Sequence, residues 1–274
     1  MFKIIIMALL IFIGMVGYDN ITDKAQPTTP VQQEQQKVSN HEKSAAMALF
    51  TSLLPPKEEW PSPVHKFYLA FNMDEVIDPI RQNPNWTGLD AMSRDIPQAL
   101  IAIEDHAFYN HGAIAVEGIL RAALANINAG EVVQGGSTLT QQFVKNVFLS
   151  HEQSMERKIE EAVLSLMLED NYSKDEILEL YLNTTYFGAG STGIKQASRT
   201  YFGKAPSALT LAEAAVIASL PYAPTSLNPL ENPEGCKKRQ LLVLAAMHKY
   251  GMINQGQLAE AKAEKIRLTN GTVM

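Results

Sequence analysis

The sequence has little cysteine, and this scarcity limits the kinds of site that the protein can hold. Cys236 is the single cysteine among 274 residues. One thiol cannot form an internal disulfide bond, and it cannot build a cysteine-rich zinc site. The six histidines are dispersed and include no H-E-x-x-H pair, so a zinc-protease centre is not indicated either. The cellular compartment must therefore be inferred from the N-terminus.

A basic surplus is missing as well. The formal net charge is −6, whereas nucleic-acid-binding domains usually carry a basic face or a high pI. We therefore expect no nucleic-acid partner. The sequence also lacks the Gly-Lys-Ser/Thr of a phosphate-binding P-loop, so nucleotide chemistry is not indicated. What remains is an ordinary globular composition, with 46% hydrophobic and 19% charged residues and enough length for one sizeable domain.

The N-terminus combines a short apolar run with flanks that fit export. Residues 4–16 are apolar and follow Lys3, which matches a signal-peptide core and falls short of the ~20 residues that span a bilayer. No A-x-A-like site follows, because Met15 and Val16 stand where small residues are needed. We predict that residues 1–20 form an uncleaved membrane anchor, with Lys3 snorkelling in a thinned bilayer. A cleaved signal and a buried helix are the alternatives.

The rest of the chain is predicted to be a polar linker followed by one helical domain. Residues 21–60 are polar, glutamine-rich and marked by prolines, as expected of a linker and irregular region. Residues 61–274 form the predicted domain, with its motifs in residues 94–263. Apolar residues recur there at helical spacing, and capping boxes are expected to open helices at Ser150, Ser173 and Thr210. Because convincing alternating strands are absent, we predict a mainly α fold.

The first of four notable motifs is Glu104-Asp105, followed by Phe108 and His111. The two carboxylates end a predicted apolar helix over residues 96–104. A carboxylate in that place would be partly desolvated, which raises its pKa and suits proton transfer. The alternative is an ordinary solvated helix end at which His111 only caps or packs.

The second motif places a polar helix face behind a glycine turn. Gly135-Gly136 would let the backbone approach a ligand closely, and Ser137 or Thr138 would cap the next helix. By the i, i+3, i+4 rule, one face of that helix carries Thr138, Gln142, Lys145 and Asn146. A polar face with one cation suits a sugar-phosphate ligand, while a simple solvated face is the alternative.

The third motif places one carboxylate among cations. Arg157 and Lys158 stand four and three residues before Glu161, so the three share a helix face. As plain surface ion pairs they would each stabilise the helix by about 0.3–0.5 kcal/mol. In a functional interpretation, the cations bind an anionic leaving group.

The fourth motif, residues 173–183, is predicted to be a structural helix whose Tyr181 and Asn183 fix its neighbours. In order and spacing, the four motifs resemble those of the peptidoglycan glycosyltransferase family, whose domains occur in class A penicillin-binding proteins and as monofunctional enzymes. The similarity covers about residues 94–263. It implies a lysozyme-like, mainly helical fold that polymerises lipid II into β-1,4-linked glycan strands, with inversion and release of undecaprenyl pyrophosphate.

The resemblance also assigns roles to individual residues. Glu104 matches the general base that deprotonates the acceptor hydroxyl. Glu161 matches the second glutamate, which assists pyrophosphate departure directly or through a loosely held divalent cation, Mg²⁺ or Mn²⁺. The family positions that line or support the cleft are matched by Asp105, Phe108, His111, Thr138, Gln142, Lys145, Asn146, Arg157 and Lys158.

The expected partners are lipid II, the nascent glycan strand, the membrane and other cell-wall synthesis proteins. We expect the catalytic domain on the outer face of the cytoplasmic membrane. Neither a Ser-x-x-Lys nor a Lys-Thr-Gly motif is present, so a monofunctional enzyme without transpeptidase activity, or a shortened relative, is expected.

Several positions depart from the family pattern. Gln153 stands where relatives usually have arginine, Ala107 replaces a residue that is often basic, and residues 113–115 lack a common acidic residue. These departures keep open a weakly active cell-wall scaffold. A lysozyme-like glycan-cleaving enzyme is a second alternative, because such enzymes share the fold and also place a catalytic glutamate at a helix end. The cations of the second and third motifs favour synthesis, because a cleaving enzyme has no pyrophosphate to bind.

Overall fold

The computed structural model describes residues 68–69, 72–120, 135–149 and 154–274. The predicted anchor over residues 1–20 and the predicted linker over residues 21–60 lie outside them. No helix in the described part of the chain is long and apolar enough to cross a membrane. The chain divides into two units, Met1–Leu69 and Ala70–Met274, and the motifs all lie in the second.

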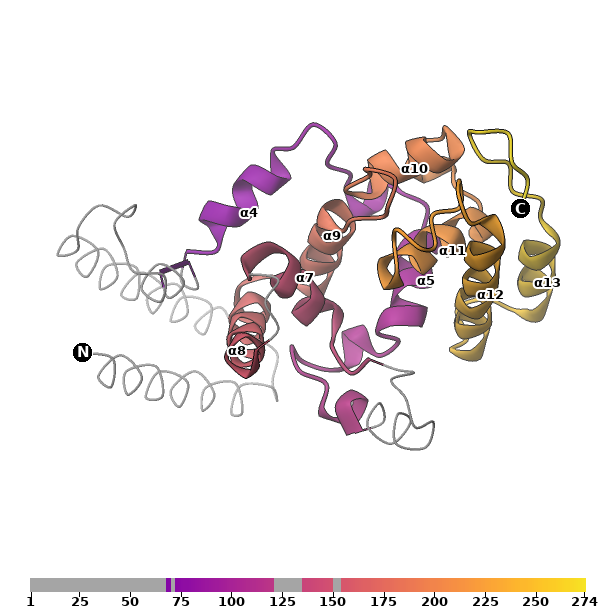
Figure 1. Ribbon diagram of the computed structural model, residues 1–274. Helices are drawn as coiled ribbons and strands as arrows, with labels where there is room; N and C mark the ends of the chain where they lie inside the picture. The colour runs from indigo at the N-terminus through magenta and orange to yellow at the C-terminus, as the bar shows by residue number, and fades with distance from the viewer. Residues whose placement is uncertain (1–67, 70–71, 121–134, 150–153) are drawn as a thin grey trace. The chain divides into compact units, whose positions relative to one another are not determined.

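The second unit is built from helices (Figure 1). Its α-helices are α4 (Asp74–Arg81), α5 (Asp95–Glu104), α7 (Leu139–Phe148), α8 (Met155–Asn171), α9 (Lys174–Thr184), α10 (Ile194–Phe202), α11 (Leu211–Ser219), α12 (Pro233–Lys249) and α13 (Gln255–Ala263). Its short 3-10 turns are η2 (Leu89–Ala91), η3 (Phe108–Asn110), η4 (Pro206–Ala208) and η5 (Leu220–Tyr222). Extended pairing among the described residues is limited to the isolated bridges Tyr186–Thr192 and Arg267–Val273. The predicted mainly α fold is confirmed for these residues, and its likeness to lysozyme stays a prediction.

Side-chain caps explain where several helices begin. The Thr138 hydroxyl caps α7 in a reciprocal box with Gln141, and Ser173 opens α9 by the same arrangement. Thr210 opens α11 in a third box. Each such cap satisfies backbone N–H groups that the first helical turn leaves unpaired and stabilises the helix by about 1 kcal/mol. The boxes predicted at Ser173 and Thr210 are therefore confirmed.

Helix α8 begins later than predicted. Its N-cap is Ser154, which has an extended backbone and accepts a hydrogen bond from the Arg157 N–H at 3.1 Å. Two serines four residues apart can both act as caps, and local sequence does not choose between them. The start predicted at Ser150 is thus wrong for this helix, while Ser150 and Gln153 themselves lie outside the described residues.

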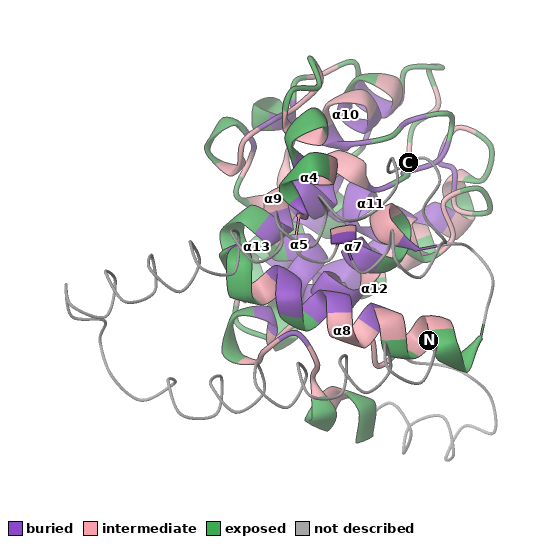
Figure 2. Ribbon diagram, turned by 90° about the vertical axis from the view of Figure 1, so that its left-hand side faces the viewer, coloured by how far each residue is buried: buried purple, intermediate pink, exposed green. Residues whose placement is uncertain are grey.

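The core forms where α5 packs against α11 and α12, as the views in Figures 1 and 2 show. Every residue of α11 after the first is buried, as expected of a helix that is apolar nearly all round. Ala212, Ala214 and Ala215 keep its surface small, so neighbouring helices can approach closely. Burial of Ile96 and Leu100 holds α5 on this core, and its C-terminal Glu104 is positioned in consequence.

Helix α9 links this core to the segment before α5. The Asn183 side chain accepts a hydrogen bond from the Thr87 N–H and donates one to the Thr87 carbonyl, each at 2.9 Å. The Glu179 carboxylate accepts a further bond from the Trp86 indole at 3.1 Å. The structural role predicted for Asn183 is confirmed by these contacts.

Candidate active site

A cavity of about 430 Å³ opens at the C-terminal end of α5. It is lined by residues 102–107, by parts of the segments 110–118 and 135–138, and by Tyr250 beyond α12. Among the predicted site residues, Glu104, Asp105, His111 and Thr138 line it. The fold therefore brings the first two motifs together around one cavity, which is the usual form of a ligand site.

Glu104 is a partly buried carboxylate on the cavity wall. Burial raises its pKa, and this effect outweighs the lowering by a hydrogen bond from Gln142 and by the charges of Arg239 and Lys145. The Gln142 amide donates to Glu104 Oε2 at 3.1 Å. The raised pKa inferred from the helix-end position is confirmed in direction. A carboxylate whose pKa is raised towards the working pH is a better general base.

A buried tyrosine stands behind this hydrogen bond. The Tyr181 hydroxyl, on α9, donates to Gln142 Oε1 at 3.0 Å, and the ring is only 1% exposed. With its oxygen held by Tyr181, the amide of Gln142 presents its NH₂ group to Glu104. The two hydrogen bonds that connect Tyr181, Gln142 and Glu104 thus fix the carboxylate from the protein interior. The sequence indicated only a structural role for Tyr181, because no spacing signal connects α9 to α5.

Arg239 is a second residue that the predicted site lacked. It lies on α12 and its charge lowers the pKa of Glu104. Its guanidinium lies 4.1 Å from the ring centroid of Tyr222, and its buried Nε has no hydrogen-bond partner among the described residues. The only sequence feature that could have indicated Arg239 was its position within the region of similarity to the family, about residues 94–263.

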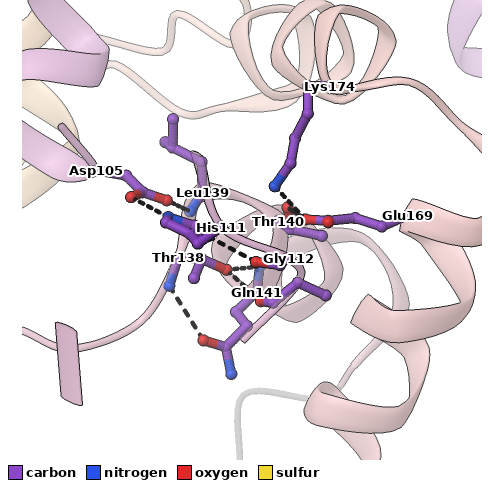
Figure 3. A network of polar contacts seen from close by, with 10 residues as sticks. Asp105, His111, Gly112, Thr138, Leu139, Thr140, Gln141, Glu169 and Lys174 are labelled. Carbon is purple, nitrogen blue, oxygen red and sulfur yellow. Dashed lines mark hydrogen bonds and ion pairs between the residues drawn. The ribbon is translucent and has the colours of Figure 1, made fainter. Parts of the chain in front are cut away.

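Asp105 joins the first motif to the second (Figure 3). Its Oδ1 lies 2.6 Å from His111 Nε2, and its Oδ2 accepts the Leu139 N–H at 3.0 Å. The other ring nitrogen of His111 faces the Gly112 carbonyl at 2.6 Å. A carboxylate at the start of α7 is also favoured by the helix dipole. Asp105 and His111 therefore support the cavity wall as well as lining it.

Phe108 supports the site from outside the cavity. Its ring is fully buried, and Lys174 Nζ lies 4.5 Å from the ring centroid. Lys174 also binds Glu169 at 2.6 Å, and the Thr140 hydroxyl donates to the same carboxylate at 2.6 Å (Figure 3). This network ties η3 to α7, α8 and α9.

A cationic cluster on α8 lies beside the cavity. Glu161 is 2% exposed and accepts hydrogen bonds from Arg157 at 3.1 Å and from Lys158. Lys158 also donates to the hydroxyl of Ser137, a cavity-lining residue, at 3.1 Å. Arg157 Nε is buried without a hydrogen-bond partner in the described part of the chain. With two cations to one carboxylate and an unused donor, the cluster suits an anion rich in oxygen atoms.

Glu161, the residue predicted to meet a divalent cation, is surrounded by cationic side chains in the structure. Both oxygens of Glu161 already accept hydrogen bonds from cations. Within the described ranges, no group of three or more His, Cys, Asp or Glu side chains could hold a metal. A protein-bound Mg²⁺ site normally offers one or two free carboxylates.

The two remaining predicted residues lie on the exposed side of α7. Lys145 does not line the cavity, but its charge acts on Glu104. Asn146 follows it on the same helix and is also exposed. The structure thus gathers most of the predicted residues into a carboxylate site and a cationic cluster joined through Ser137, while Lys145 and Asn146 lie exposed on α7.

Comparisons with known proteins identify the family of the chain. The transglycosylase family profile matches residues 73–248. A putative transglycosylase of Cupriavidus necator is 41% identical over 194 residues, which cover 71% of this chain and 84% of that protein. Penicillin-binding protein 1A of Neisseria flavescens is 44% identical over 68% of this chain, and that of Aquifex aeolicus is 44% identical over 64%. The chain spans only 23% and 24% of these two longer relatives. It belongs to the transglycosylase family.

Proposed function

We propose that the protein is a peptidoglycan glycosyltransferase that polymerises lipid II into β-1,4-linked glycan strands and releases undecaprenyl pyrophosphate. One observation carries the proposal. A partly buried carboxylate with a raised pKa, Glu104, shares a cavity with Ser137, which bonds to the Arg157–Lys158–Glu161 cluster. Family membership supports glycosyltransferase activity independently.

In this mechanism Glu104 removes the proton from the acceptor sugar's hydroxyl. The resulting oxygen attacks the anomeric carbon of the donor from the face opposite its pyrophosphate. The carbon–pyrophosphate bond breaks, its electron pair leaves with the pyrophosphate, and the configuration inverts. As in inverting glycosidases, the two carboxylates act at separate points around the sugar.

Arg157 and Lys158 bind the departing pyrophosphate. Negative charge grows on that group as the bond breaks, so cations held in place beforehand stabilise the transition state more than the ground state. Glu161 keeps the two side chains in position. We further propose that Glu161 would be the protein's contact for a loosely held Mg²⁺ or Mn²⁺, which would supply further positive charge to the leaving group.

The two other candidate functions have less support. A glycan-cleaving enzyme would have no use for the pair of cations that Ser137 connects to the cavity. A weakly active scaffold would not need the Tyr181–Gln142 support behind Glu104. No observation favours either one over synthesis.

The proposal extends to location and partners. We propose that the enzyme works at the outer face of the cytoplasmic membrane on lipid II and the nascent strand, beside other cell-wall synthesis proteins. We also propose that it is monofunctional. A fluorescent penicillin should then leave the protein unlabelled under conditions that label a class A penicillin-binding protein, and covalent labelling would contradict this.

The deciding experiment is the conversion of labelled lipid II to polymer by the purified full-length protein in detergent. Glu104→Gln keeps the shape of the side chain but cannot accept a proton, so we expect turnover to fall by about 10²–10⁴-fold. The matched control is Glu234→Gln, an exposed position in the first turn of α12 outside the cavity. Both variants should match the wild type in circular dichroism. Near wild-type turnover by Glu104→Gln would exclude Glu104 as the base.

A further inference from the structure

An aromatic pair lines the cavity, and one of its rings, that of Tyr250, comes from outside the four motifs. Tyr250 directly follows α12, and its ring stacks on His106 with centroids 4.1 Å apart and planes 17° from parallel. Both residues line the same cavity as Glu104. We call His106 and Tyr250 the aromatic wall.

The aromatic wall is held in place yet remains accessible. The Tyr250 backbone N–H donates to the Ala246 carbonyl at the end of α12, and Lys249 Nζ lies 5.1 Å from the Tyr250 ring centroid. The tyrosine is nonetheless 37% exposed, and its hydroxyl makes no hydrogen bond among the described residues. Burial of this ring contributes less to the core than that of Tyr181 or Tyr201, which are almost fully enclosed.

The distribution of charge around the cavity indicates where the charged and the uncharged parts of a ligand would bind. Among the described residues, no lysine or arginine lines the cavity. The carboxylates that line it are Glu104, Asp105 and Glu117. The cations lie beyond Ser137 on α8 instead. A phosphate group is therefore expected at α8, and an uncharged group in the cavity.

A sugar ring has the properties expected of the uncharged group in the cavity. Its C–H faces are apolar while its hydroxyl and acetamido groups are polar, so it matches a surface that combines aromatic area with a hydroxyl. The small side chain of Ala107, next to His106, leaves this part of the cavity open. Glu104 must also reach a hydroxyl of the bound sugar.

We propose that the aromatic wall binds the N-acetylated acceptor sugar whose hydroxyl Glu104 deprotonates, and that Tyr250 determines how tightly this sugar is held. The proposal rests on the function proposed above. It makes Tyr250 a substrate-contacting residue that contributes to affinity more than to the chemical step.

The experiment compares steady-state polymerisation of lipid II by the full-length wild type, Tyr250→Ala and Tyr250→Phe. Loss of one good contact of this kind raises KM by about tenfold. We expect that increase for Tyr250→Ala, with kcat within about twofold of the wild type, because contacts made equally in the ground and transition states change KM alone. Tyr250→Phe keeps the ring and should retain most of the affinity. His106→Ala should also raise KM, as Tyr250→Ala does.

Tyr186→Ala is the matched control, since this tyrosine is 44% exposed and lies outside the cavity. It should leave KM unchanged. An unchanged KM in Tyr250→Ala overturns the proposal, as does a fall in kcat that accompanies a lower melting temperature, because that result indicates a structural role. If the wild type itself makes no polymer, the proposed function fails instead, so the two failures can be told apart.

Lipid II binding to the inactive Glu104→Gln protein gives a second measurement. Adding Tyr250→Ala to that protein should weaken the Kd by about tenfold. Equal Kd values for the single and double variants would contradict the proposal.

Discussion

At the scale of single residues, the environment of Glu104 sets the pH dependence expected of the proposed general base. A general base works only when ionised, and burial raises the pKa of Glu104 above the ordinary 4.5. As pH falls through this raised pKa, the ionised fraction and the rate both decrease. The acid limb of a kcat/KM profile should therefore lie at higher pH than an ordinary glutamate would give. Gln142, Arg239 and Lys145 limit the shift by favouring the charged form.

Tyr181→Phe tests whether the buried tyrosine acts through Gln142. Without the hydroxyl, the amide of Gln142 is free to turn and its hydrogen bond to Glu104 weakens. Because that bond lowers the pKa of Glu104, we expect the acid limb to move to higher pH. We also expect kcat to fall by about tenfold, as one supporting hydrogen bond of about 1.4 kcal/mol is lost. The measurement is kcat/KM for lipid II as a function of pH.

Tyr201→Phe is the control for this change. Its hydroxyl is also buried and donates to the Phe187 carbonyl at 2.7 Å, away from the cavity. It should lower the free energy of unfolding by about 1–3 kcal/mol and leave the pH profile unchanged. If Tyr181→Phe behaves in the same way, the tyrosine has only a structural role.

At the scale of secondary-structure elements, the start of α8 combines two opposing effects. Arg157 and Lys158 lie in its first turns, where the positive end of the helix dipole disfavours cations. The Ser154 cap and the buried Glu161 offset this cost. Cations kept at an unfavourable helix end are better explained by an anionic ligand than by helix stability.

Gln153→Arg tests whether this end of α8 lacks one phosphate contact. Since Ser154 provides the cap, replacing Gln153 should have little effect on the melting temperature. A new charge-assisted contact of about 1.5–3 kcal/mol would strengthen donor binding by roughly ten- to a hundredfold. We therefore expect a lower KM for lipid II. A lower melting temperature with unchanged KM would instead assign Gln153 to helix architecture.

The loop between α9 and α10 contains a strained alanine. Ala189 has φ +48°, between Gly188 and Gly190, which also have positive φ. A left-handed conformation costs a residue with a Cβ roughly 1–2 kcal/mol, while glycine costs about 0.4–1 kcal/mol more unfolded-chain entropy than alanine. Ala189→Gly should therefore raise the free energy of unfolding by about 0.5–1 kcal/mol, measured by urea denaturation. Ala205→Gly, where φ is −73°, should lower it.

At the scale of the whole molecule, apolar side chains are exposed beside the cavity. Val116 is 64% exposed, Ile119 44% and Leu120 60%. Single exposed apolar residues are ordinary, but several gathered near one site indicate a surface that meets something apolar. A substrate with a lipid tail requires such a surface near the cavity.

A protein lacking residues 1–20 should therefore keep some affinity for membranes. In a flotation assay with anionic-lipid vesicles at low salt, we expect part of the truncated protein to float with the lipid. The same truncation with Ile119→Ser and Leu120→Ser should float less, because apolar area that inserts between lipids is lost. If the truncated protein stays entirely with the unbound fraction, residues 1–20 alone make the membrane contact.

The amino-acid sequence by itself determined the local features of this protein. The helical periodicity, the capping boxes at Ser173 and Thr210, and the position of Glu104 at the end of a helix all depend on residues within a few positions of one another. Spacing rules describe such interactions well, since neighbours on one helix are fixed by its 3.6-residue period.

Only the tertiary structure decided which distant residues support the carboxylate and line its cavity. Tyr181 reaches Glu104 through Gln142, Arg239 approaches it from α12, and Tyr250 closes the cavity against a ring 144 positions earlier in the chain. The start of α8 belongs here too, because Ser154 rather than Ser150 caps it. These choices follow from how α5, α9 and α12 pack, and packing depends on the shape and burial of whole helix faces, which a local pattern does not contain.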